Sequence, residues 1–394
     1  MSYQELSTDT VCRYIGETAA LSSRYLNIEN LTVTEIGDGN LNFVYLIREK
    51  DRPEADLIIK QAVPYCRCMG QDFALGKERM FYEIRSLKHF SRYSPRHIPD
   101  IIWADEEMAL VAMQYLGEHI TARKALIAGQ ELPKMVDHLT SFMAEVLYKT
   151  SSMCLTSHEK RDLIQQFNTN KDLCKITEDF VFTLPYTENE HKLLTEPVKQ
   201  KILALKYKFM NNTEALLHGD MHTGSMMVNR NDTYVIDSEF AFFGPIGFDV
   251  GLLMANYIFA WARHVADDNM AYASQLSEDI QQIWRQFDAK FLERWQAEQD
   301  SALGAGLFMS ADSLAEYKAL TLLGILRDSL GFACCEILRR LLGVAKVEDI
   351  ESIEDPALYR RTKEGLIKLA TALLMEYEQF TRVEQLAPYL KLEA

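Results

Sequence analysis

The order of strand-like and helix-like segments is the feature that most restricts how this chain can fold. Runs rich in β-branched and aromatic residues occupy most of residues 31–116, and one helical pattern interrupts them at 76–90. After about residue 120 the pattern is helical, apart from two short β-like runs at 226–229 and 233–239. This order predicts an α+β fold in which a β-rich lobe precedes a larger helical lobe.

We expect the β-rich lobe to span residues 1–116 and the helical lobe to span residues 117–394, with the functional site in a cleft between them. A chain of 394 residues is long enough for two lobes that each bury a core. The last long helical pattern, at 315–343, ends at Gly343, which predicts a C-terminal cap there.

The composition argues against several classes of protein. The formal net charge is -15, whereas a general nucleic-acid or membrane-surface binder needs a basic face. The longest apolar run, at 252–262, is far shorter than the ~20 residues that span a bilayer. The seven cysteines have no metal-site spacing, which favours free thiols in a reducing cytoplasm.

Two glycines lie two positions apart in the segment GDGNLN, between the first two strand-like runs. Glycines in a turn between strands let backbone N–H groups approach phosphate oxygens. Asparagine tolerates positive φ better than most residues, so it fits the same kind of turn. We therefore expect Gly37, Gly39, Asn40 and Asn42 to contact nucleotide phosphates, and an ordinary hairpin turn is the alternative.

Lys60 stands inside the apolar run 55–63, and a buried lysine needs a partner. In kinases that partner is a glutamate of the following helix, and the lysine contacts the α and β phosphates. At about 100° per residue, Glu83 shares the face of the apolar residues in the pattern at 76–90, whereas Glu78 points away. Glu83 is therefore the predicted partner, and a lysine that reaches solvent from an edge strand is the alternative.

The segment that joins the two predicted lobes consists of Met113, Gln114, Tyr115 and Leu116. An extended segment at such a junction can offer backbone N–H and C=O groups to an adenine ring. The residue types carry little information, so this prediction depends on position alone.

Three carboxylates come close together within residues 216–251. Asp220 ends the motif HGD, and Asp237 and Glu239 end a β-like run. In an extended chain, residues two apart project from one face, so we expect Asp237 and Glu239 to hold Mg²⁺ together. We expect Asp220, on the preceding loop, to take the proton of an acceptor hydroxyl, as in kinases. The alternative is that Asp220 caps a turn and the other two carboxylates are solvated.

Other polar residues of this stretch are predicted to be structural. His218 and His222 lack the further ligands that a zinc site needs, so we expect both to form hydrogen bonds that hold the loop. Asp249, in GFDVG, is predicted to brace the same loop through backbone N–H groups.

Several segments together resemble the aminoglycoside/choline-kinase-like superfamily and, within it, the methylthioribose kinase family. The resemblance spans Ile36 to Leu358 and is carried by EIGDGNLNFVY, KER, MQYL, LIAG, HGDMHTGS and LRDSLGFACCEILRRLLGVA. Most of the superfamily has asparagine at the position of Ser225, and HGDxHTGS is typical of the methylthioribose kinases.

The resemblance implies ATP-dependent phosphorylation of the 1-hydroxyl of S-methyl-5-thioribose in methionine salvage, and it implies a homodimer. It implies that Asp220 contacts the sugar and accepts its proton. Asp237 and Glu239 would hold Mg²⁺, with Ser225 as a weaker third ligand. Lys60 would contact the phosphates of ATP.

The resemblance also implies that Arg339 and Arg340 hold the sugar and the transferring phosphoryl group. On sequence alone the helix dipole accounts for cations at this helix end, and adjacent helical residues point ~100° apart. Arg340 follows Glu336 by four positions, which would hold it in place. The family often has a tryptophan in the loop before the first helix, and Phe73 is the corresponding candidate for substrate binding.

Two alternatives remain at this stage. A phosphotransferase of the same fold could act on choline, an aminoglycoside or another sugar, and a cationic acceptor would call for an acidic, aromatic pocket. A nucleotide-binding scaffold without turnover would be expected to lack at least one of Lys60, Asp220, Asp237 and Glu239, and all four are present.

Overall fold

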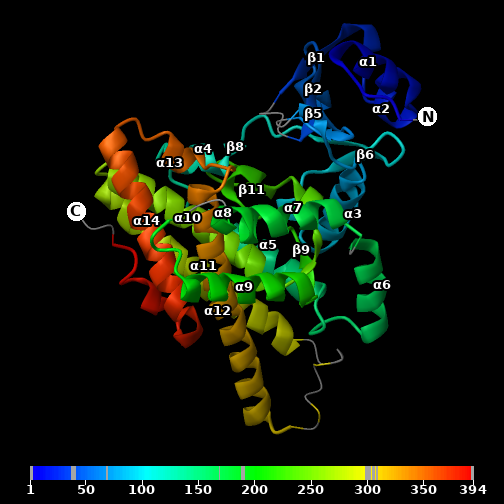
Figure 1. The fold of residues 1–394 in the computed structure, drawn as a ribbon. Coiled ribbons are helices and arrows are strands. Elements are labelled where there is room, and N and C mark those ends of the chain that lie inside the picture. The colour runs from blue at the N-terminus through cyan, green and yellow to red at the C-terminus, as the bar shows by residue number, and fades with distance from the viewer. Residues whose placement is uncertain are drawn as a thin grey trace. The chain divides into compact units, whose positions relative to one another are not determined.

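The computed structural model describes residues 3–36, 41–67, 70–167, 169–187, 191–297, 303, 307 and 309–391. The chain forms two compact units (Figure 1). The first comprises Met1–His119 and Tyr234–Phe240, and the second comprises Ile120–Thr233 and Ala241–Ala394. The short segment Tyr234–Phe240 therefore packs with residues that lie far earlier in the chain.

The first unit is built on an antiparallel sheet of five strands. Alternate residues of a strand face the same side, so Tyr45 and Ile47 of β2 and Ile59 of β3 enter one apolar core. Lys60 is one position out of phase and projects from the opposite side of the sheet. In order across the sheet, the strands are β1 (Leu31–Glu35), β2 (Asn42–Glu49), β3 (Leu57–Ala62), β7 (Leu110–Gln114) and β6 (Ile101–Asp105).

Helix α3 (Arg79–Tyr93) contacts β3, β6 and β7 of this sheet. Its position agrees with the helical pattern predicted at 76–90. The other elements of the first unit are α1 (Thr8–Glu17), α2 (Ala19–Ser22), β4 (Tyr65–Cys66), β5 (Gly70–Ala74), η1 (Ile28–Asn30), η2 (Pro53–Ala55), η3 (Pro95–His97) and η5 (Ser238–Phe240).

Two features of the first unit differ from the sequence-based prediction. That prediction has one helix here, whereas α1 and α2 precede the sheet. The signal for α1 is a capping box, because the Ser7 N–H donates to Oγ1 of Thr10 at 2.8 Å while Oγ of Ser7 accepts from the Thr10 N–H. Phe73 is not in a loop, because it lies in β5, which pairs with β4 with Tyr65 opposite Ala74.

The second unit is mainly helical. Its helices are α4 (Ala122–Ile127), α5 (Met135–Lys149), α6 (Ser157–Phe167), α7 (Lys171–Phe182), α8 (Leu184–Thr187), α9 (Glu196–Asn211), α10 (Gly247–Ala266), α11 (Met270–Ala297), α12 (Ala311–Leu342), α13 (Glu348–Glu351) and α14 (Pro356–Glu376). Its shorter elements are β8 (Ile120–Thr121), β9 (Ala215–Leu217), β10 (Met226–Val228), β11 (Thr233–Val235, of which only Thr233 belongs to this unit), β12 (Phe242–Gly244), η4 (Thr223–Ser225), η7 (Tyr377–Gln379) and η8 (Val383–Leu386).

Helix α10 lies at the centre of the second unit, against α11 and α12. Every residue from Gly247 to Ala262 is buried, which explains why this helix is apolar all round. A Cβ atom on Gly251 would lie 2.4 Å from the carbonyl oxygen of Ser329, so glycine is what lets α12 approach this closely. None of the helices in the described part of the chain combines the length and the apolar character that crossing a membrane requires.

Helix α12 ends at Leu342, and Gly343 is its C-cap, which confirms the predicted end. The Gly343 N–H donates to the carbonyl oxygen of Arg339 at 2.8 Å. The backbone of Gly343 is extended, with φ of -80°, and so the cap does not use the left-handed conformation.

Replacing Gly251 with alanine should destabilise the second unit, because the new methyl group would meet backbone atoms of α12 that cannot move aside. We expect a loss of ~1–3 kcal/mol in the free energy of unfolding. Gly324→Ala is the matched control, since a Cβ atom there meets no described atom within 4 Å. That variant should gain ~0.5–1 kcal/mol, because alanine favours a helix interior. Urea unfolding of both variants measures these changes, and equal effects would contradict the close-packing argument.

Candidate active site

Lys60 is the centre of a buried ion cluster in the first unit. Its Nζ lies 2.7 Å from Oε1 of Glu83 and 2.5 Å from Oδ1 of Asp237. The predicted pairing of Lys60 with Glu83 is therefore confirmed, and Glu78 instead lies at the start of α3. The side chain of Asp237 is 43% exposed, whereas those of Lys60 and Glu83 are almost fully buried. Asp237 is thus the member of this cluster that a solvent-borne ligand can reach.

Burial and pairing act in opposite directions on these groups. Burial alone would lower the pKa of Lys60, but Asp237, Glu83 and Glu239 raise it above its ordinary value. Lys60 therefore remains a cation. Burial raises the pKa of Glu83 to about 7, although Lys60 lowers it. Shifts of this kind occur where burial and specific charges are combined, as they are at many functional sites.

The segment that carries Asp237 and Glu239 is not extended, contrary to the prediction. Asp237 has φ of 62°, in the left-handed region, and Ser238 begins the 3₁₀ turn η5. Oγ of Ser86 in α3 lies 2.7 Å from Oγ of Ser238 and holds the turn. A non-glycine residue in this backbone conformation is uncommon and is often found at functional sites. Local backbone geometry therefore separates the directions of the two carboxylates.

Glu239 is occupied by protein partners in this structure. Nδ2 of Asn42 donates to both of its carboxylate oxygens, at 3.1 and 3.0 Å. Nε of Arg79 lies 3.2 Å from Oε2 of Glu239. The side chain of Glu239 is only 7% exposed. Glu239 therefore anchors its segment, and Asp237 is the more available of the two carboxylates.

The guanidinium of Arg79 joins four parts of the first unit. Nε donates to Oδ1 of Asn42 at 3.1 Å, and Nη2 donates to the carbonyl oxygen of Leu41 at 2.9 Å. Nη1 donates to the carbonyl oxygens of Val63 and Gly76, at 2.8 and 2.9 Å. Arg79 thus ties the residues after the predicted phosphate loop to the residue after β3, to the residues before α3 and to the Glu239 segment. Arg79 belongs to the segment KER, and no role was predicted for it.

The structure describes only some of the residues that were predicted to contact the nucleotide. Gly37, Gly39 and Asn40 lie outside the described residues. Met113 and Gln114 end β7, and the Gln114 N–H donates to the carbonyl oxygen of Asp100 at 2.9 Å.

Tyr115 and Leu116 follow β7 directly. The carbonyl oxygen of Leu116 accepts from the His119 N–H at 3.0 Å. The hydroxyl of Tyr115 accepts from Nη2 of Arg48 at 3.2 Å. Residues 113–116 therefore lead from β7 into a turn that the hydrogen bond from His119 to Leu116 closes.

In the second unit, a tight turn presents Asp220. Strand β9 pairs with β12, which brings the start of α10 beside the HGD motif. The carboxylate of Asp249 accepts from the N–H groups of His218 and Gly219, at 2.7 and 3.0 Å. Gly219 has φ of 82°, a conformation that glycine adopts without strain. The predicted bracing role of Asp249 is confirmed.

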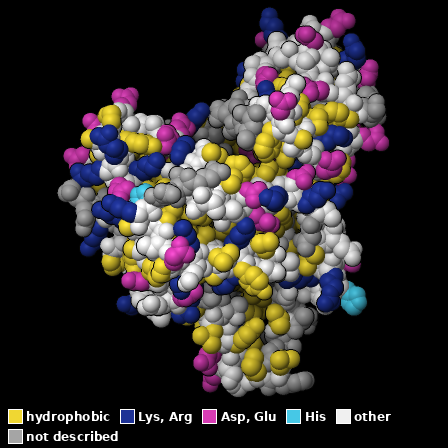
Figure 2. Space-filling model, viewed as in Figure 1, with side chains coloured by type: hydrophobic (Ala, Val, Ile, Leu, Met, Phe, Trp, Pro, Cys, Tyr) yellow, Lys and Arg dark blue, Asp and Glu magenta, His cyan; other side chains and the backbone are white. Residues whose placement is uncertain are grey.

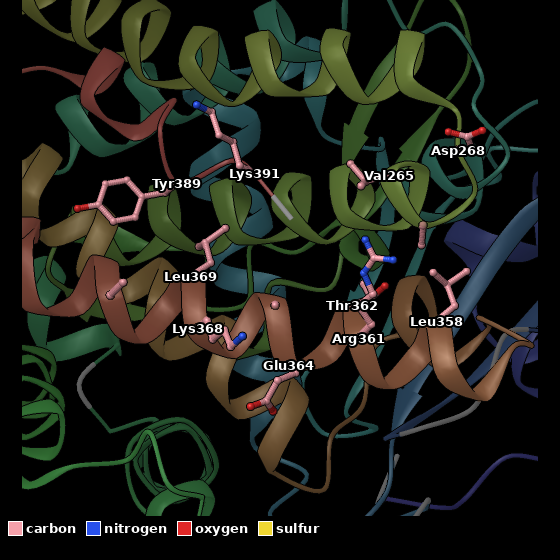
Figure 3. Close-up of a pocket in the computed structure, with 13 residues that line it drawn as sticks. Val265, Asp268, Leu358, Arg361, Thr362, Glu364, Lys368, Leu369, Tyr389 and Lys391 are labelled. Atoms are coloured by element: carbon pink, nitrogen blue, oxygen red, sulfur yellow. The ribbon is translucent and has the colours of Figure 1, made fainter. Parts of the chain in front are cut away.

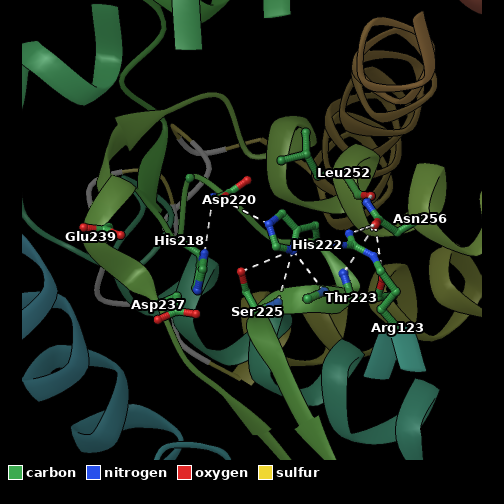
Figure 4. Close-up of polar contacts among 12 residues, drawn as sticks. Arg123, His218, Asp220, His222, Thr223, Ser225, Asp237, Glu239, Leu252 and Asn256 are labelled. Carbon is green, nitrogen blue, oxygen red and sulfur yellow. Dashed lines mark hydrogen bonds and ion pairs between the residues drawn. The ribbon is translucent and has the colours of Figure 1, made fainter. Parts of the chain in front are cut away.

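The ring of His222 holds the next part of the turn (Figure 4). Its Nδ1 accepts from the N–H groups of Gly224 and Ser225, at 3.0 and 3.1 Å, so this nitrogen carries no proton. The proton of the neutral ring must then be on Nε2, which lies 3.2 Å from Oδ2 of Asp220. His222 is thus a neutral donor to Asp220. His218 also acts within the turn, since its Nδ1 accepts from the Asp220 N–H at 3.3 Å, and both histidines are loop residues, as predicted.

Arg339 and Arg340 both point at one carboxylate. Nε of Arg340 lies 2.8 Å from Oε1 of Glu336, and Nε of Arg339 donates to the other oxygen of Glu336. The two side chains converge although adjacent helical residues point ~100° apart, because long arginine side chains bend across one turn. Nη2 of Arg339 lies 3.8 Å from Oδ1 of Asp220. Arg339 therefore makes an ion pair with Asp220.

Asp220 stays ionised in this environment. Burial alone would raise its pKa, but the contact with His222 and the charges of Arg339 and Arg340 lower it well below the ordinary value. A carboxylate fixed in a turn, with a neutral imidazole and two guanidinium groups beside it, can orient a hydroxyl group and accept its proton. The arginines add positive charge where an anion would be transferred.

Comparisons with known proteins show the family of this chain. A model of the phosphotransferase enzyme family matches residues 32–286. Methylthioribose kinase 1 of Oryza sativa subsp. japonica is 33% identical to this chain, over 99% of this chain and 95% of that protein. The methylthioribose kinase of Bacillus cereus (strain AH820) is 35% identical, over 96% of this chain and 94% of that protein. The chain belongs to the methylthioribose kinase family.

A solved structure supports the fold alone. A glucosamine kinase in complex with glucosamine, ADP and inorganic phosphate has a TM-score of 0.50 and 11% sequence identity, over 94% of this chain and 88% of that chain. The predicted kinase-like α+β fold and the predicted enzyme class, a kinase, are confirmed by the family and the architecture. The resemblance to the methylthioribose kinase family that HGDMHTGS carries is confirmed as well.

Further residues of this methylthioribose kinase family member contact the turn that follows Asp220, but they were missing from the site predicted from the sequence. Oδ1 of Asn256 accepts from Nη2 of Arg123 at 3.2 Å and from Oγ1 of Thr223 at 3.1 Å (Figure 4). Arg123 also lies 3.3 Å from Asp349. A sequence signal existed for Asn256, which is a polar residue inside the apolar run LLMANYIFAWA.

A cavity in the second unit lies away from these residues. It has a volume of about 650 Å³ and lies between the end of α10, α14 and the last described residues of the chain (Figure 3). Its lining includes Val265, Arg361, Lys368, Tyr389 and Lys391, and none of the predicted site residues. The catalytic assignment therefore rests on the polar geometry around Asp220 and not on this cavity.

The neutral state of His222 makes the stability of the turn depend on pH. Burial, Arg123 and Arg340 lower the pKa of His222, whereas Asp220 raises it, and the net shift is downward. Below the ordinary value of about 6.5, the unfolded chain binds a proton at this histidine before the folded chain does. The contribution of His222 to the free energy of unfolding is therefore full above that pH. It is lost as the pH falls from there through the lower pKa of His222 in the folded chain. We expect the melting temperature of the wild type to drop more steeply between pH 7 and 5.5 than that of His222→Asn.

His222→Asn is the control for this comparison, because an amide oxygen can accept from the same N–H groups and does not titrate. Differential scanning fluorimetry at several pH values measures both proteins. Parallel curves would show that His222 does not titrate against folding.

Proposed function

We propose that this chain transfers the γ-phosphoryl group of ATP to the 1-hydroxyl of S-methyl-5-thioribose, which yields S-methyl-5-thioribose 1-phosphate and ADP in methionine salvage. The observation that carries the proposal is the position of Asp220, in a turn braced by Asp249, with His222 and Arg339 against its carboxylate. The relatives named methylthioribose kinase supply the acceptor.

In this mechanism Asp220 orients the 1-hydroxyl and accepts its proton as the oxygen attacks phosphorus. An anomeric hydroxyl is more acidic than an ordinary alcohol, so positioning matters more than basicity. Arg339 and Arg340 balance the charge of the transferring phosphoryl group and contact the sugar. Glu336 holds both arginines, which reduces the freedom that they lose when the substrate binds.

The first unit would bind ATP. Lys60, kept cationic by its carboxylate partners, contacts the α and β phosphates. Gly37, Gly39 and Asn40 would add backbone N–H groups.

Adenine would bind the backbone of Met113, Gln114, Tyr115 and Leu116. Phe73, in β5, would contribute to closure over the substrate. We assign nucleotide binding to residues 1–116 and catalysis with substrate binding to residues 117–394.

The donor atoms near Lys60 fit Mg²⁺. Asp237 offers an exposed carboxylate, and the cation prefers oxygen ligands from one or two carboxylates together with phosphates and water. When bound, Mg²⁺ would offset the negative charge of the phosphates. We propose Asp237 as the principal ligand. Glu239, held by Arg79, would be a second ligand, and the hydroxyl of Ser225 a weaker one.

The environment of Asp220 also favours a neutral acceptor over a cationic one. Arg339 and Arg340 lie beside it, and Arg123 is close enough to act on His222. Three guanidinium groups would repel choline or an aminoglycoside, whereas the hydroxyl groups of a sugar can accept from them.

A panel of acceptors tests the proposed function. ADP release from ATP is measured with methylthioribose, ribose, choline and kanamycin, and turnover should be highest with methylthioribose. Asp220→Asn keeps the shape of the side chain and removes its charge, so kcat should fall by ~10²-fold or more while the KM for ATP is nearly unchanged. Equal or better turnover of choline or kanamycin would overturn the assigned acceptor, and an unchanged kcat for Asp220→Asn would make Asp220 structural.

The two proposed metal ligands should differ in their sensitivity to substitution. Asp237→Ala should abolish activity at any Mg²⁺ concentration, because its carboxylate is the exposed ligand. Glu239→Gln should retain part of the activity, and added Mg²⁺ should restore more of it, since Asn42 and Arg79 still hold the side chain. The measurement is kcat as a function of Mg²⁺ concentration. A Glu239→Gln enzyme as inactive as Asp237→Ala would contradict this division.

We also propose that the chain acts in the cytoplasm as a homodimer, as the resemblance implies. Exposed apolar side chains are available for contact between copies, among them Leu203 and Tyr207 on α9 and Leu320 on α12. Figure 2 shows hydrophobic side chains over the first part of α12, in the lower part of the view. Light scattering that gives the mass of one 45.3 kDa chain would contradict the dimer.

A further inference from the structure

Arg123 lies against the turn Thr223–Ser225, which follows Asp220 and is called the catalytic turn below. The proposed reaction assigns no role to Arg123 itself. It is the second residue of α4, directly after β8, and β8 pairs with β10 so that Thr121 is opposite Met227. This pairing brings the guanidinium to the backbone of η4. A Cβ atom on Gly224 would lie 3.0 Å from Nη1 of Arg123. The close approach depends on Gly224 having no side chain.

The side-chain amide of Asn256 links Arg123 to the turn (Figure 4). Oδ1 of Asn256 accepts from Nη2 of Arg123 at 3.2 Å, and from the N–H and the hydroxyl of Thr223 at 3.4 and 3.1 Å. The amide itself is fixed, because its Nδ2 donates to the carbonyl oxygen of Leu252 at 2.9 Å. Thr223 and Gly224 belong to the same turn as His222, which donates to Asp220. The chain of contacts therefore reaches the proposed base.

Asp349 places Arg123 from the opposite side. It lies in the first turn of α13, is 1% exposed, and its Oδ2 is 3.3 Å from Nε of Arg123. Within the described part of the chain, neither carboxylate oxygen of Asp349 accepts a hydrogen bond, and Nε of Arg123 donates none. A buried ion pair with so little hydrogen bonding is more often a cost in stability than a gain.

The pKa shifts of Arg123 and Asp349 also indicate that this ion pair costs stability. Burial lowers the pKa of Arg123 and raises the pKa of Asp349 to about 6, so burial disfavours the charged form of each. Polar groups that are buried at such a cost call for a reason other than stability. The location of the pair beside the catalytic turn supplies that reason.

We propose that Arg123 and Asp349 are positioning residues of the phosphoryl-acceptor site: Asp349 orients Arg123, and Arg123 with Asn256 fixes the turn Thr223–Ser225 and so the contact of His222 with Asp220. This inference rests on the proposed role of Asp220 as the base. It adds a third arginine to the site, and this arginine acts through the turn and does not touch the substrate. A purely structural pair would only tie α13 to α4.

The test compares the full-length wild type with Arg123→Gln, Arg123→Lys and Asp349→Asn. Each protein is assayed with saturating ATP and the acceptor that the wild type turns over fastest, and its melting temperature is recorded. We expect Arg123→Gln and Asp349→Asn to lower kcat by ~10²-fold with the KM for ATP within about twofold of wild type, since small displacements at a reacting centre have effects of this size. Arg123→Lys should recover only part of kcat, because one ammonium group cannot reach both Asn256 and Asp349.

Arg294→Gln is the matched control. It removes a guanidinium that pairs with Glu145 between α11 and α5, outside the site, and it should leave kcat unchanged. If Arg123→Gln or Asp349→Asn does not fold, Thr223→Val replaces it. This nearly isosteric change removes only the hydroxyl that donates to Asn256, and it should lower kcat by about 3–10-fold with an unchanged KM for ATP.

The outcomes separate the two proposals. Lower melting temperatures with wild-type kcat for Arg123→Gln and Asp349→Asn, or wild-type kcat for Thr223→Val, would overturn the positioning role. A wild type that prefers an acceptor other than methylthioribose would overturn the assigned acceptor, while the same variants measured with the preferred acceptor would still decide the positioning role.

Discussion

Arg79 cannot leave its guanidinium unpaired in the interior of the first unit, and this requirement organises the residues that we propose to bind the nucleotide. Its donors reach the carbonyl oxygens of Leu41, Val63 and Gly76 and the carboxylate of Glu239. These partners come from the end of the predicted phosphate loop, from the residue after β3, from the residues before α3 and from the segment that carries Asp237. One buried cation thus fixes the parts that we propose to meet around a nucleotide, because a buried guanidinium needs its hydrogen-bond partners.

In the second unit, buried anions rather than a buried cation hold the parts of the site together. Glu336 receives two arginines, Asp249 receives two backbone N–H groups, and both carboxylates lie in the interior. The result is a turn in which Asp220 remains ionised although only 22% of its side chain is exposed. Such preorganisation is the usual way in which an enzyme avoids rearranging polar groups during the reaction. The weakly hydrogen-bonded pair of Arg123 and Asp349 fits this view, since stability is given up where function needs a fixed charge.

Much of the site could be predicted because it depends on local order. Lys60 in an apolar strand required an acidic partner, and helical phase selected Glu83. Asp249, in GFDVG, was predicted to brace the HGD loop through backbone N–H groups, and it does so. The prediction failed for the backbone of Asp237, which a two-residue repeat placed in an extended chain. The left-handed conformation of Asp237 occurs together with the contact between Ser238 and Ser86, and no local pattern reveals that contact.

The sequence by itself determined that a strand-rich part precedes a helical part, the family, and which acids and bases could do chemistry, because these follow from residue types and their spacing along the chain. Only the tertiary structure decided which of them meet. Arg123, Asn256 and Asp349 lie far apart in the chain, and helix and strand packing alone brings them together. The pairs of Glu336 with Arg339 and Arg340 are different, because they lie three and four positions apart in one helix and so follow from local order. Pairing of buried charges between distant segments acts through space, and so it is set by the fold and not by the order of residues.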